Sequence, residues 1–141
     1  MTDLPAALKR SPALWLAMVT ALLLTDPGAA ADARAALADA TERASAQYRI
    51  VMRALETQGR EQTAAEVRVF RERWGEIIAR FGKDAAAGNE RLASALMDVE
   101  MRLVGALIVI DIGSREAARE ALIPVGEALG RIRTQAAPPP R

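Results

Sequence analysis

The chain has 141 residues, of which 51% are hydrophobic and 26% charged, the balance of a single soluble globular domain. Its 19 basic and 18 acidic residues give a net charge of +1, so nothing in the charge indicates binding to nucleic acid or to an anionic membrane. Histidine and cysteine are both absent, which excludes histidine-based catalytic triads, thiolate metal sites, disulfides and histidine-ligated haem.

The N-terminal segment has the order of a secretory signal peptide. Two basic residues precede an uncharged run at 13–24, and small alanines stand just before Asp32. As a helix, that run would be roughly 18 Å long, whereas a membrane hydrocarbon core is about 30 Å thick. We therefore expect residues 1–31 to be removed on export to the periplasm, leaving no membrane contact. The alternative is that the segment is retained as an anchor.

The first two helices follow from apolar residues repeating every three or four positions. Residues 32–58 predict one amphipathic helix, which Gly59 is placed to end in a left-handed conformation. Residues 61–81 predict a second helix, which carries both phenylalanines and Trp74 and ends at Gly82.

The third predicted helix, at 89–112, carries one continuous apolar stripe and is expected to be the central helix of the fold. The stripe consists of Asn89, Leu92, Leu96, Val99, Leu103, Ala106 and Ile110. Asp84 and Asn89 are both suitable N-caps, and we favour a start near Asp84 with an interruption at Gly88. Residues 103–110 are apolar on every side. This part of the helix is therefore expected to be covered all round.

The last helix is predicted at 115–133, after a glycine stop at Gly113 and an N-cap at Ser114. Two helical hairpins with short loops predict an all-α, antiparallel up-down-up-down four-helix bundle over residues 32–134, preceded by the signal peptide. Residues 135–141 are rich in proline and are predicted to form a disordered tail.

The apolar part of the central helix supplies the main candidate binding residues. Three roles for it stay open, namely simple core, an interface with a second copy or another protein, and the lining of a pocket for an apolar ligand. The candidate ligand or interface residues are Leu103, Val104, Leu107 and Ile108.

A second candidate is a metal site made by Met97, Asp98 and Met101. Two thioethers one helical turn apart, with a carboxylate beside them, suit a soft ion such as Cu(I). The alternative is that the methionines flank the core and the carboxylate is solvated. An enzyme using carboxylates alone would instead need two of Asp98, Glu100 and Asp111 in one cleft. No cofactor is predicted.

Charged residues elsewhere are interpreted as solvated helix faces. The four-residue spacing from Glu76 to Arg80 and from Glu127 to Arg131 favours ion pairs along a helix.

The scaffold resembles the periplasmic four-helix-bundle cytochromes of the b562 and c-prime types. The resemblance is strongest over 103–132, where a long helix, Gly113 and three alanines at 117, 118 and 121 are similar to the last hairpin of those proteins. Those families hold haem through a histidine near the C-terminus, where this chain has Arg-Ile-Arg-Thr at 131–134. The resemblance therefore implies the fold and carries over no haem ligand.

Together these observations predict an exported, non-enzymatic accessory or interaction protein of the periplasm that binds a protein partner or forms a homodimer. The alternative is a periplasmic carrier or sensor of an apolar ligand or a metal ion.

Overall fold

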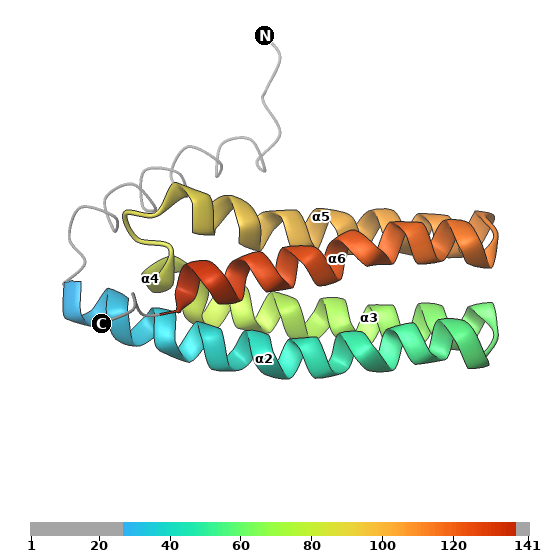
Figure 1. Cartoon of the computed structure of the whole chain (residues 1–141), viewed down its shortest axis with the longest axis horizontal. Coiled ribbons are helices and arrows are strands. Elements are labelled where there is room, and N and C mark those ends of the chain that lie inside the picture. Colours follow the sequence, from blue (N-terminus) through green and yellow to red (C-terminus); the bar gives the residue numbers. More distant parts are fainter. Residues whose placement is uncertain (1–26, 138–141) are drawn as a thin grey trace, which may run out of the picture.

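The computed structural model describes residues 27–137, and this part of the chain is all-α (Figure 1). No strand occurs within it, and none of its helices is long and apolar enough to cross a membrane. Its elements are α2 (Pro27–Thr57), α3 (Arg60–Ile77), the π-helix η1 (Ile78–Gly82), the short α4 (Lys83–Ala85), α5 (Glu90–Ile112) and α6 (Arg115–Ala136).

The four long helices lie side by side (Figure 1). Helices α2 and α5 both pack against α3 and α6, so α2 and α5 face each other diagonally across the core. The two-residue connections 58–59 and 113–114 lie at the same end of the molecule, and the longer connection through η1 and α4 lies at the other end (Figure 1).

The core is built from the apolar stripes that the sequence predicts. On α5 the buried residues are Leu92, Ala95, Leu96, Val99, Leu103, Ala106 and Ile110. Trp74 of α3 is fully buried, and its indole nitrogen Nε1 donates a hydrogen bond of 3.2 Å to the backbone oxygen of Leu96. Its ring is nearly parallel to that of Phe70, with 6.5 Å between the centroids. Helices α3 and α5 are therefore joined both by packing and by a buried hydrogen bond.

The start of α2 differs from the predicted start at Asp32. Within the described residues α2 runs from Pro27, five residues before that position. Ala30 in this first part of α2 is buried. Of the predicted signal peptide, residues 1–26 lie outside the described residues.

Helix α2 ends just before Gly59, as predicted, but the left-handed conformation predicted for Gly59 and the predicted stop at Gly82 are both wrong. Gly59 is extended, with φ −76° and ψ 170°, and is the N-cap of α3 rather than a left-handed end of α2. Gly82 is helical, and the chain continues through it to Ala85. The left-handed residue is Gly88, with φ +70°.

The favoured start of the central helix at Asp84 is also wrong. Asn89 is the N-cap of α5, and its side-chain Oδ1 accepts a hydrogen bond of 3.1 Å from the backbone amide of Leu92. Because Gly88 turns the chain directly before Asn89, α5 begins only after Asn89.

The predicted cap of the last helix is confirmed. The Ser114 hydroxyl accepts a hydrogen bond of 3.1 Å from the amide of Ala117. Helix α6 continues through Pro124 and ends at Ala136, beyond the predicted end at residue 133. Since Ala136 is buried, residues 135 and 136 belong to the folded part and not to the predicted tail, of which 138–141 lie outside the described residues.

Candidate functional site

The most distinctive surface feature is an apolar stripe on the outward side of α5. Five large apolar residues follow one another at spacings of four, three, four and four, which places them on one face of the helix. Their exposed fractions run from 36% for Val104 to 80% for Ile112. This outer α5 stripe consists of Met97, Met101, Val104, Ile108 and Ile112.

The structure divides the predicted binding residues between two environments. Leu103 is buried in the core, and Leu107 is half-buried against it. Val104 and Ile108 are exposed on the outer α5 stripe. Of the three roles left open for the apolar run at 103–110, simple core does not account for the whole run, because α3 and α6 pack against α5 while no described residue covers its outward side.

Gly105 lies among the residues of the stripe and is itself exposed. A Cβ atom added to it would meet nothing within 4 Å, so packing within the described chain does not require a glycine here. Glycine in a helix interior costs about 1 kcal/mol relative to alanine. What it provides is a low point on the surface that another backbone can approach closely.

The predicted metal site loses its charged ligand. The Asp98 carboxylate accepts hydrogen bonds from Arg102 at 2.9 Å and from Arg131 of α6 at 3.0 Å. Met97 and Met101 are exposed on the outward side of α5. The carboxylate that would complete the site with them is instead paired with two guanidinium groups. Across residues 27–137, no group of three or more histidine, cysteine, aspartate or glutamate side chains could hold a metal.

The three carboxylates proposed for an enzyme do not share a cleft. Asp98 is directed to α6, whereas Glu100 forms an ion pair of 2.8 Å with Arg71 of α3 on the other side of α5. Asp111 is exposed near the end of the helix. Asp98, Glu100 and Asp111 are therefore not brought together in one site.

The two predicted ion pairs within helices do not form. Arg131 bonds Asp98 instead of Glu127, and the Arg80 guanidinium lies over the ring of Phe81, 5.3 Å from its centroid. Arg131 therefore bonds a residue of another helix, and Arg80 stacks on its neighbour in the chain.

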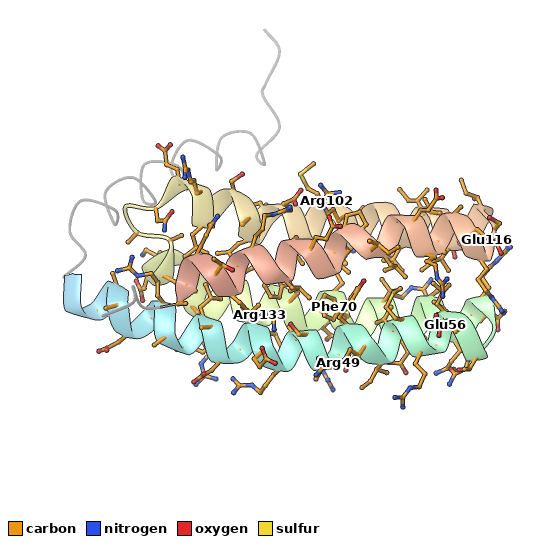
Figure 2. All side chains as sticks on the ribbon, viewed as in Figure 1. Arg49, Glu56, Phe70, Arg102, Glu116 and Arg133 are labelled. Carbon is orange, nitrogen blue, oxygen red and sulfur yellow. The ribbon has the colours of Figure 1, made fainter. Side chains whose placement is uncertain are left out.

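The seam between α2 and α6 is closed by polar contacts, in contrast to the outward side of α5. Arg133 of α6 pairs with Glu42 of α2 at 2.7 Å, and Arg119 of α6 pairs with Glu56 of α2. Arg133 and Glu56 are both labelled in Figure 2. Charges line this seam, whereas the outer α5 stripe contains none.

At the end that holds the two short connections, arginine side chains bridge the helix ends beside a pocket of about 210 Å³. Arg60, at the start of α3, donates hydrogen bonds of 3.1 Å to the backbone oxygens of Asp111 and Gly113. Arg115 donates to the backbone oxygen of Glu56 at 3.4 Å. These arginines satisfy carbonyls at helix ends, so their role is structural.

A second surface feature is a groove between α2 and α3 that reaches η1, with a volume of about 310 Å³. Three aromatic side chains, three arginines and one carboxylate are among the residues that line it, namely Phe70, Trp74, Phe81, Arg43, Arg73, Arg80 and Glu76. Arg73 donates a hydrogen bond of 3.0 Å to the buried side chain of Gln47, whereas Arg43 has no ion-pair partner in the described part of the chain. Single π-helical turns inside helices are frequent at functional sites. We call this feature the α2–α3 groove.

Comparison of the chain with family models, with curated proteins and with solved structures finds no match. The resemblance to the four-helix-bundle cytochromes therefore stays a prediction, and the two surface features are what bear on function.

Proposed function

We propose that this chain is an exported, non-enzymatic interaction protein, an antiparallel up-down-up-down four-helix bundle that binds a protein partner through the outer α5 stripe. One observation carries the proposal, namely five large apolar side chains exposed on a single uncharged face of one helix. Contiguous apolar surface of this kind marks interaction sites. The short connections 58–59 and 113–114 support the bundle topology.

The size of the stripe indicates a reversible complex. The exposed fractions of its five residues together amount to about three whole side chains. Burying one such side chain contributes roughly 1.5–3 kcal/mol, so one face contributes roughly 4–9 kcal/mol. Association costs roughly 4–15 kcal/mol in lost motion and ordering. A partner must therefore bring an apolar face of similar size for a stable complex to form.

The proposal is tested by photo-crosslinking in the cell that makes the protein. A photoreactive phenylalanine derivative replaces Met101 in one variant and Ile50 in the control. Ile50 is also an exposed apolar residue, but it lies on α2, diagonally across the core from α5. A crosslinked product from position 101 alone is expected. Equal products from both positions, or no product from either, would contradict the proposal.

Export is the second part of the proposal, and the sequence pattern at 1–31 supports it. Cleavage before Asp32 would remove the first five residues of α2 and leave the rest of that helix in place. N-terminal sequencing of the protein recovered from the periplasm is expected to begin at Asp32. Full-length chain in the membrane fraction would instead favour a retained anchor.

The α2–α3 groove favours a second candidate function, the carriage of a small apolar anion. Its volume of about 310 Å³ lies at the lower end of the range of ligand pockets, about 300–1,000 Å³. An apolar body fits its aromatic lining, and a carboxylate fits its arginines. Isothermal titration with decanoate is expected to show binding that replacement of Arg43 and Arg80 by alanine removes. Heat changes that are identical in that variant would reject this candidate.

A further inference from the structure

The positions along the outer α5 stripe have an internal symmetry. The stripe is centred between Val104 and Gly105, which are adjacent residues. Met101 and Ile108 lie at equal distances on either side of this centre, and so do Met97 and Ile112. Reversing the direction of the helix about this centre therefore leaves the other four large apolar positions of the stripe unchanged and exchanges Val104 with Gly105.

We infer that the partner of the outer α5 stripe is a second copy of this chain, with the two α5 helices packed antiparallel about that centre; the inference rests on the proposed function. A two-fold interface is self-complementary, since residue i meets j and j meets i. Here Met101 meets Ile108 of the second copy, Met97 meets Ile112, and Val104 lies over Gly105. Every large apolar residue of the stripe thus faces either another large apolar residue or the glycine.

This arrangement explains why position 105 is a glycine. Packing within the described chain leaves open space at its Cβ position, so the chain alone does not explain a glycine in the middle of α5. Because it has no side chain, Gly105 makes room for Val104 of the second copy and allows the two backbones to approach closely. A parallel pairing would instead place glycine against glycine and leave a gap at the centre.

The charges of α5 are compatible with this pairing. Asp98, Glu100 and Arg102 all have ion-pair partners within their own chain, and Asp98 and Glu100 are directed to opposite sides of the helix. None of these three side chains has to be buried without a partner when the stripe is covered. Asp111 is exposed beside Ile112 and forms no ion pair within residues 27–137, and its place near the end of α5 puts it at the edge of the interface. The interface can therefore be apolar at its centre and charged only along its edges, as protein interfaces commonly are.

No other face of the described chain offers comparable apolar surface. Eight large hydrophobic residues are exposed in the part that the structure describes, and five of them form the stripe. The other three lie singly on different helices, and they are Ile50 on α2, Val69 on α3 and Ile123 on α6. Only α5 therefore presents a continuous apolar face to a second copy.

The register is tested with introduced cysteines, which report cleanly because the chain contains none. Purified Met101→Cys and Ile108→Cys proteins are mixed, allowed to exchange subunits and treated with a short bifunctional thiol reagent. The crosslink between positions 101 and 108 is expected to exceed either same-position crosslink at least fivefold. In the antiparallel pairing, two copies of position 101 are offset by about 10 Å along the helix axis. Ile50→Cys mixed with Ile108→Cys is the control and is expected to give no specific product.

Each outcome separates the inference from the proposed function. Dominant 101–101 and 108–108 crosslinks would overturn the antiparallel register. A protein that stays monomeric in solution while position 101 still crosslinks to a different protein in the cell would overturn the second copy as partner and leave the proposed function standing. If it neither self-associates nor crosslinks from position 101, both fail.

Discussion

Replacing Ile108 by alanine should weaken the dimer strongly while leaving the fold intact. The substitution removes three carbon groups, each worth about 0.8 kcal/mol when buried. Ile108 is 56% exposed in the single chain, so about 1.3 kcal/mol of this burial is gained only in the dimer. A two-fold interface contains the residue twice, which gives about 2.7 kcal/mol, or a dissociation constant raised roughly 100-fold. The already buried part of the side chain costs the single chain only about 1 kcal/mol.

Sedimentation velocity over a range of concentrations measures this dissociation constant. Ile50→Ala is the matched control, because Ile50 is 49% exposed and lies on α2, which is diagonally opposite α5. The control should change the dissociation constant less than threefold while removing the same atoms. An unchanged constant for Ile108→Ala, or an equal loss for both variants, would refute α5-to-α5 packing.

Three further predictions concern the packing of the fold. Gly126→Ala should lower the free energy of unfolding by about 1–3 kcal/mol, because the new Cβ would lie 2.7 Å from the Tyr48 ring. Gly130 lies in open space on the same helix, so Gly130→Ala should raise the free energy of unfolding by about 0.5–1 kcal/mol. Urea unfolding compares the two, and equal shifts would show that the close contact is not limiting. Burial raises the pKa of Tyr48 above 10.0, and the Glu127 charge raises it further, so the unfolded chain loses this proton first and stability should fall as pH rises above about 10. Since the chain has a single tyrosine, an ultraviolet titration follows this pKa directly, and Glu127→Gln should lower it; an unchanged value would remove Glu127 as a cause. Trp74→Phe should cost about 1–3 kcal/mol, because it removes the hydrogen bond to Leu96 and leaves a small cavity, and a thermal melt followed by circular dichroism that matches wild type would contradict this.

The sequence alone determined the helical class and most of the core. Residues at spacings of three and four lie on one face of a helix, which is why every apolar residue of the predicted stripe is buried on α5, where the structure adds only Ala95. The Ser114 cap was equally predictable, since its hydrogen bond reaches only three residues along the chain. Such features depend on local geometry, which the order of residues contains directly.

Tertiary packing decided which glycine turns the chain and which side of α5 stays exposed. Glycine permits helical, extended and left-handed backbone alike, and Gly82, Gly59 and Gly88 adopt these three in turn according to how the neighbouring helices meet. The predicted stripe already placed Leu103 on the inner face, but the run at 103–110 is apolar on every side, so the sequence could not show whether its outer face is covered as well. Only the positions of α3 and α6 beside α5 show that Ile108 stays exposed.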